Sequence, residues 1–92
     1  MQLPSSIEKR LRTDNYLRVN SRAIRSIDFA AGPRTLEVEF IDGVVYHYYR
    51  VPRQIWTRML EIIESGGSLG TYVNQDVKSE VKRLDLDYRK IN

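Results

Sequence analysis

Residues 40–53 constrain the fold more than any other part of this 92-residue chain. They read Phe-Ile-Asp-Gly-Val-Val-Tyr-His-Tyr-Tyr-Arg-Val-Pro-Arg. Asp-Gly is a hairpin signal, and the tyrosine-rich run after it is typical of a strand. Pro52 suits the first position of a helix, where its missing N–H costs nothing. The segment therefore predicts a strand, a tight turn, a second strand and a helix in immediate succession.

Two further strands precede the turn. Residues 23–29 form the first candidate, which Ala31-Gly32-Pro33 ends with strong turn chemistry. Residues 35–40 alternate between apolar and polar side chains, which is the period of a half-buried strand.

The length of the hairpin loop decides where the tyrosines lie, because a one-residue slip turns every side chain to the other face. A two-residue loop places Tyr46 and Tyr48 with the glutamates, whereas a three-residue loop, 41–43, places them with the apolar side chains. We favour the three-residue loop because it keeps one face apolar and puts Gly43 where a left-handed residue is needed. It leaves an open second face with Glu37, Glu39, Val45, His47 and Tyr49.

The helix that starts at Pro52 carries an apolar stripe, and Ser65-Gly66-Gly67 ends it. This stripe and the apolar face of the sheet satisfy each other by packing together. The predicted core is therefore Leu36, Val38, Phe40, Tyr46, Tyr48, Ile55, Trp56, Met59, Leu60 and Ile63. The predicted fold is α+β: a three-stranded antiparallel meander packed on one main helix, with short flanking helical segments.

The flanking segments are less regular. Ser5 and Glu8 have the spacing of a capping box and predict a short helix over residues 5–13. Residues 68–78 resemble a short helical turn. The tail, residues 79–92, fits either a helix or a strand.

Composition narrows the function classes. The chain has no cysteine and one histidine, so it lacks a disulfide framework and the usual ligands of a zinc site. No apolar run is long enough to span a bilayer, and arginines interrupt residues 1–20, where a signal peptide would lie. We expect a cytoplasmic protein with no cofactor and no metal.

Motifs for catalysis are absent. His47 is expected on an exposed or partly exposed strand face, and no nucleophile elbow accompanies it. Gly67-Ser-Leu-Gly70 matches the Gly-x-x-Gly of KH domains, but a helix terminator followed by a new cap is the simpler interpretation. We expect a non-enzymatic binding domain.

Basic residues are concentrated at the start of the chain. Residues 1–34 hold seven bases, six of them arginine, against three acids, whereas residues 35–49 hold three acids and no lysine or arginine. Arginine suits phosphate, and a helix N-terminus favours anions. These features favour nucleic acid, with RNA first, as the partner. The candidate contact residues are Arg18, Arg22, Arg25, Tyr49, Arg50 and Arg53.

The alternative hypothesis is a protein-interaction module that docks on a partner or on a second copy. Its anchors would be Ile41, Val45 and Tyr49 on the open face of the sheet.

A set of short motifs occurs in order along the chain: Val19-Asn20-Ser21, Ile24, Ile27, Phe29, residues 36–40, Gly43, Tyr46-His47-Tyr48, Val51-Pro52, Ser68, Gly70, Tyr72 and Asn74. Their order and spacing resemble the KTSC domain, a family named for its occurrence at the C-terminus of some lysyl-tRNA synthetases and also found as a stand-alone bacterial and phage protein. The resemblance covers residues 19–80, between a basic arm or short helix (1–18) and a C-terminal extension (81–92). One departure is visible, because Ser65-Gly66-Gly67 lengthens the loop before Ser68. The resemblance implies a possible RNA-binding role.

Overall fold

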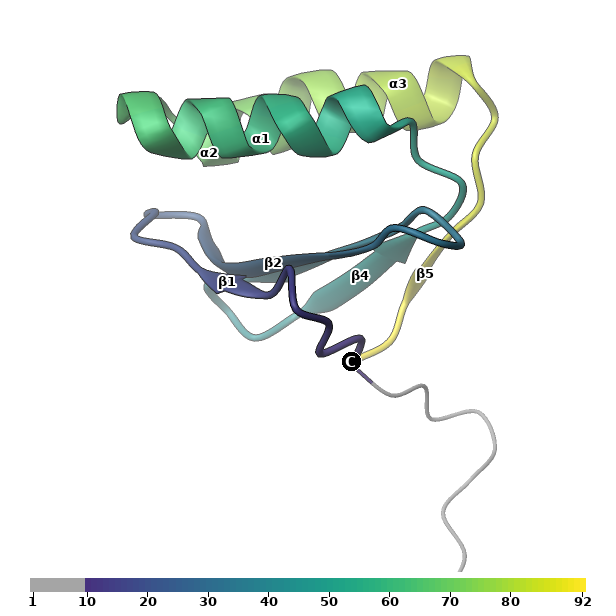
Figure 1. Ribbon diagram of the computed structural model, residues 1–92, viewed down its shortest axis with the longest axis horizontal. Coiled ribbons are helices and arrows are strands. Elements are labelled where there is room, and N and C mark those ends of the chain that lie inside the picture. The colour runs from purple at the N-terminus through teal and green to yellow at the C-terminus, as the bar shows by residue number, and fades with distance from the viewer. Residues whose placement is uncertain (1–9) are drawn as a thin grey trace, which may run out of the picture.

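The computed structural model describes residues 10–92 as a sheet with helices on one face (Figure 1). The sheet has five antiparallel strands in the order β1-β2-β3-β4-β5. The strands are β1 (Leu17–Arg18), β2 (Ile24–Ala30), β3 (Thr35–Phe40), β4 (Val45–Tyr48) and β5 (Tyr88–Lys90). The helical elements are α1 (Arg53–Ser65), α2 (Leu69–Thr71), the π-helix η1 (Tyr72–Val77) and α3 (Lys78–Arg83).

The predicted three-stranded meander corresponds to β2, β3 and β4. The number of strands was too low, because β1 pairs with β2 and β5 pairs with β4 at the two edges. β1 and β5 are only two and three residues long, and their side chains are exposed, so neither shows the buried alternation by which a strand is recognised.

The β3–β4 hairpin has the predicted three-residue loop. Val38 pairs with Tyr46, and the Phe40 N–H donates to the Val44 carbonyl at 2.8 Å. Gly43 adopts a φ of 92° in this loop, in the left-handed region where glycine carries no steric penalty. The register therefore puts the tyrosines of β4 on the face that carries Leu36 and Val38.

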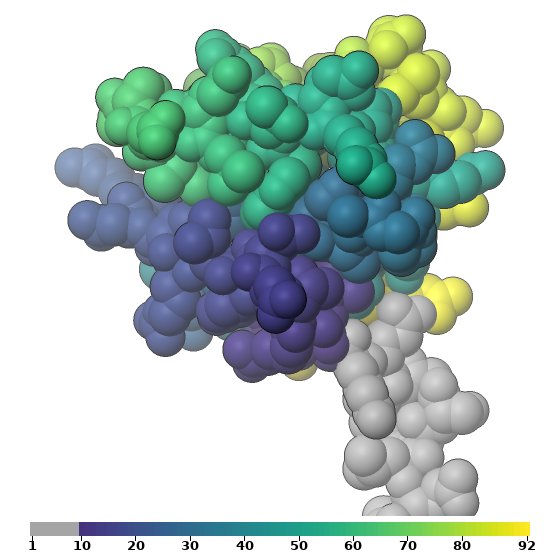
Figure 2. Space-filling view, in the orientation of Figure 1, coloured from purple at the N-terminus to yellow at the C-terminus, as the bar shows by residue number. Residues whose placement is uncertain are grey.

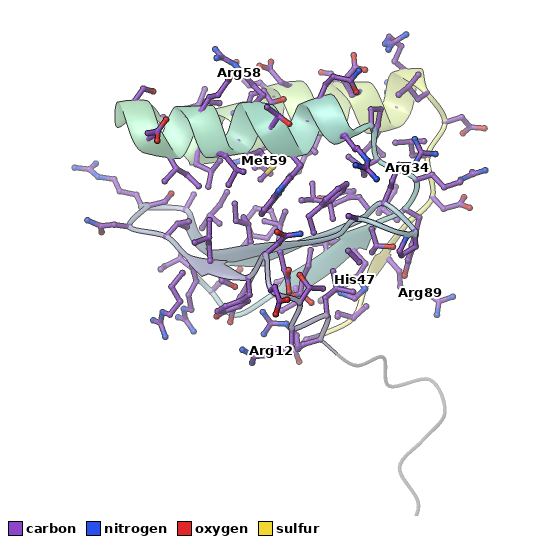
Figure 3. The ribbon with its side chains drawn as sticks, in the orientation of Figure 1. Arg12, Arg34, His47, Arg58, Met59 and Arg89 are labelled. Carbon is purple, nitrogen blue, oxygen red and sulfur yellow. The ribbon has the colours of Figure 1, made fainter. Side chains whose placement is uncertain are left out.

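Helix α1 packs its apolar stripe on the sheet. Met59 points toward the sheet while Arg58 points away from it (Figure 3), and Trp56 stacks on Phe29 with ring centroids 5.5 Å apart. Leu60 was predicted in the core but is 37% exposed. Leu60 follows Met59 by 100° of helical rotation, so it lies beyond the edge of the stripe, and Ile62 is buried instead. Ile63, which was also predicted in the core, is half-buried and packs against the core.

A second helical run, residues 69–83, lies beside α1 on the same face (Figure 1). Gly66 ends α1 in a left-handed conformation, and the Ser68 hydroxyl accepts the Thr71 N–H at the start of the next run, as a terminator and cap should. The tail, residues 79–92, was predicted to be either a helix or a strand. It contains both, because α3 continues to Arg83 and strand β5 follows.

The second face of the sheet was predicted to be open, but in the structure it is covered. Val45 is fully buried and His47 is 3% exposed. The chain from residue 10 to residue 16 lies across this face and bonds its carboxylates: Leu11 N–H donates to Glu37, and Thr13 N–H donates to Asp28. Residues 10–13 are not helical, and the rest of the predicted helix over 5–13 lies outside the described residues.

Between residues 10 and 92, no helix combines the length and the apolar character that crossing a membrane requires.

Candidate functional site

Three tyrosines converge on a cleft between the edge of the sheet and α3. Tyr46 and Tyr48 come from β4, and Tyr88 comes from β5, where it pairs directly with Tyr48. The ring centroids are 6.1 Å apart for Tyr46–Tyr48, 6.3 Å for Tyr46–Tyr88 and 6.0 Å for Tyr48–Tyr88. Val81 and Leu86 complete the apolar lining of a cleft of about 530 Å³, here called the tyrosine cleft.

The tyrosine hydroxyls are available to a ligand. Tyr48 is 4% exposed, yet none of the three hydroxyls has a hydrogen-bond partner within residues 10–92. Burial, together with the neighbouring Tyr46 and Tyr88, raises the pKa of Tyr48 to about 12. The Tyr48 hydroxyl therefore stays protonated at neutral pH and can donate a hydrogen bond. Tyr88 is 62% exposed, so a face of its ring is free for stacking.

Two lysines of α3 give the cleft positive charge. Lys78 and Lys82 both line it and lie one helical turn apart, and Asp85 is the only acid in its lining. The Lys78 ammonium sits 5.6 Å from the centre of the Phe40 ring, a cation–π distance. This combination of ring faces, hydroxyl donors and ammonium groups suits a flat ligand that carries negative charge.

The arginines named from the sequence do not gather at one place. Arg22 lines the same groove as Gly66, the C-cap of α1, whereas Arg53 is the first residue of α1, and 13 helical residues span about 20 Å. Arg25 donates to the Ile41 carbonyl and lies 3.8 Å from Glu39. Arg18 is exposed on β1.

Arg50 and Tyr49 also differ in their surroundings. Arg50 is exposed in the turn after β4, 3.9 Å from Asp87. Tyr49 is half-buried, with its ring edge against His47 at 6.3 Å. Tyr49 therefore belongs to the covered face of the sheet rather than to the tyrosine cleft.

His47 was expected to be exposed or partly exposed, but it is part of a buried polar cluster on that covered face (Figure 3). Its Nε2 lies 2.8 Å from Glu37 Oε2, and Arg10 Nη2 lies 2.9 Å from Glu37 Oε1. Burial would raise the pKa of Glu37, but bonds from His47, Arg10 and the Leu11 N–H outweigh it and lower the pKa to about 2. The cluster ties the start of the described chain to the sheet. Among the described residues, no three acidic or histidine side chains are arranged to hold a metal ion.

Sequence reasoning missed Tyr88, Lys78 and Lys82. Lys78 and Lys82 are four residues apart beside Val77 and Val81, a helical spacing that was visible. The alternation of Leu84, Leu86 and Tyr88 indicated a strand. What the sequence did not indicate is that this strand pairs with β4 and brings its tyrosine next to the other two.

Comparison with known proteins supplies the family. The family model of the KTSC domain matches residues 20–80. An uncharacterized protein of Stutzerimonas stutzeri (strain A1501) is 34% identical over 62 residues, which are 67% of this chain and 82% of that protein. The paired central strands, the Tyr-x-Tyr of β4 and the helix after Pro52 all fall within the matched residues. The chain belongs to the KTSC domain family.

Proposed function

We propose that this domain is a non-enzymatic module that binds single-stranded nucleic acid, with RNA as the favoured partner, and that bases stack in the tyrosine cleft. The tyrosine cleft carries the proposal: three rings about 6 Å apart lie under two lysines. Aromatic platforms beside basic groups are a common way to hold unpaired bases and their phosphates.

The unpaired hydroxyls support RNA over DNA. A protein distinguishes the two by contacts to the ribose 2′-hydroxyl, which both donates and accepts hydrogen bonds. Tyr46, Tyr48 and Tyr88 present such partners at the cleft, and Tyr48 remains a donor at neutral pH.

In this proposal Tyr88, rather than Tyr49, stacks on a base. The arginines attract the nucleic acid through non-specific electrostatics. Arg22, Arg50 and Arg53 are exposed and raise the local concentration of a polyanion without contacting bases.

The test is fluorescence anisotropy with labelled eight-nucleotide oligomers, rU8 and dT8, titrated at several salt concentrations. Tyr88→Ala should weaken binding by about 1 to 3 kcal/mol, the usual value of one stacked base, while Tyr88→Phe should keep most of the affinity. Because Tyr88 is 62% exposed, its loss should leave the fold intact.

Lys78→Gln and Lys82→Gln should each reduce the dependence of log K on log salt by about 0.7, since each removes one phosphate contact. Arg58→Gln is the matched control, because Arg58 points away from the sheet and pairs with Glu61. The proposal is wrong if neither oligomer binds at low salt, or if Tyr88→Ala binds as tightly as the parent protein.

A further inference from the structure

A second groove, of about 650 Å³, lies at the other end of the helical run 69–83. Residues 19–23, before β2, form one wall, and the end of α1 and the start of α2 form the other. The loop before β2 and the end of α1 meet at the left of the molecule in Figure 2. We call it the amide groove after its exposed carboxamide side chains, which are Asn20, Asn74 and Gln75, and Arg22 lines it as well.

Gly70 permits a close backbone approach in the wall of the amide groove. A Cβ at this position would lie 2.8 Å from the Cβ of Ala23, closer than side chains pack. The backbone of α2 therefore approaches the loop before β2 directly. Asn74, four residues further on, lines the same groove as Asn20.

Some polar groups of the groove have structural roles and some do not. The Ser21 hydroxyl accepts from the backbone N–H groups of Ala23 and Ile24, and the Ser68 hydroxyl caps α2. Asn20 and Asn74 are exposed, and their side chains make no hydrogen bond within the described chain. Their carboxamides are therefore free to donate to and accept from a ligand.

The amide groove and the tyrosine cleft lie along one line of the same helical run. The buried residues Leu69, Val73, Val77 and Val81 recur every four positions and stay in the core throughout. The residues that follow each of them recur at the same spacing and so form a second straight row beside the sheet. That row is Gly70, Asn74, Lys78 and Lys82, with the first two in the amide groove and the last two in the tyrosine cleft.

We propose that a strand held in the tyrosine cleft continues along this row into the amide groove, where Asn20 and Asn74 read the edge of a base and Arg22 contacts a phosphate. The inference rests on the proposed function and adds sequence selectivity to it. Stacking tolerates any base because each has a π-face, whereas a carboxamide discriminates by its donor and acceptor pattern.

The spacing suits a short oligomer. Asn74 and Lys82 are eight residues apart, which is at most about 12 Å along the helical run at the α-helical rise of 1.5 Å per residue. Stacked nucleotides rise 3.4 Å each, so no more than about four nucleotides separate the two sites. A dinucleotide whose two bases stack in the tyrosine cleft leaves no base for the amide groove, whereas an octamer can occupy both sites.

The experiment compares rA8, rC8 and rU8 with the dinucleotides ApA, CpC and UpU, by anisotropy or by NMR titration. The parent protein should prefer one octamer by about fivefold or more. Asn20→Ala and Asn74→Ala should remove that preference and leave dinucleotide binding unchanged, and the Asn20 and Asn74 side-chain NH2 resonances should shift only with octamers. Gln54→Ala serves as the control amide, because Gln54 is exposed on α1 away from both sites.

The outcomes separate the two proposals. If the octamers bind through Tyr88 but the asparagine variants keep the parent preference, the strand does not continue into the amide groove. This inference is then wrong, and the proposed function stands. The same holds if the parent protein binds the three octamers equally. If no oligomer binds at all, both proposals are wrong.

Discussion

Glu37 shows how one residue reports on the covered face of the sheet. Its carboxylate is fully buried and is held by His47, Arg10 and the Leu11 N–H. Removing one partner of such a buried cluster usually costs more than the pair itself contributes, because the remaining charges stay buried without compensation. Glu37→Gln should therefore lower the free energy of unfolding by about 3 to 5 kcal/mol, measured by urea denaturation at pH 7.

The same carboxyl predicts a pH dependence. Its pKa is lowered to about 2 in the folded protein, so its contribution to stability is complete above the ordinary carboxyl pKa. That contribution is lost as the pH falls from about 4.5 toward 2. Glu37→Gln should flatten the stability curve in this window, whereas Glu64→Gln, at an exposed position of α1, should follow the parent. An unchanged slope for Glu37→Gln would contradict the buried cluster.

Gly70 is the residue at which the two ends of the family motif touch. Gly70→Ala should destabilise the domain by about 1 to 3 kcal/mol, because the new methyl group would collide with the Cβ of Ala23. Both atoms are attached directly to the backbone, so the backbone would have to move to relieve the collision. Alanine's better helix propensity offsets about 1 kcal/mol of this cost. Gly32→Ala is the matched control, since its Cβ would meet nothing within 4 Å. Equal thermal midpoints for the two variants would show that the loop before β2 yields easily.

The π-helix η1 keeps the buried residues of the helical run 69–83 on one side. The buried residues Leu69, Val73, Val77 and Val81 are spaced four apart, whereas an α-helical turn holds 3.6 residues. In an ideal α-helix each of them would be rotated by about 40° from the one before, or about 120° from Leu69 to Val81. A π-helical turn holds more residues, as the bond from Lys78 N–H to the Val73 carbonyl shows. It removes this drift and keeps Val81 on the sheet side.

The segment 10–16 behaves as an extra layer of the fold. A chain that begins at residue 17 should unfold at lower denaturant than one that begins at residue 10, because it lacks the bonds to Asp28 and Glu37. Both chains lack residues 1–9, so the difference isolates this segment. The shorter chain should also show a weaker acid dependence from Glu37, because it loses Arg10 and the Leu11 N–H but keeps His47. Equal denaturation midpoints would mean that the segment adds nothing to stability.

At the scale of the whole molecule, the sheet is packed on both faces. Helices cover the face with Leu36 and Val38, and the segment 10–16 covers the face with Glu37 and His47 (Figures 1 and 3). The expected protein-docking surface on an open face is therefore not present in the described chain. The two grooves that we propose as binding sites both lie along the helical run 69–83 instead.

The sequence alone determined the elements whose signals are local. The period-two alternation of residues 35–40, the turn at Gly43 and the stripe of α1 each bury apolar area in one way only, so strands, register and main helix were predictable. Only the tertiary structure decided the partners of the polar face and of the edges. Glu37 and His47 look solvent-facing by pattern, but distant Arg10 and Leu11 compensate their burial. Tyr88 likewise joins Tyr46 and Tyr48 only because β5 pairs with β4, a contact between remote segments that no local periodicity encodes.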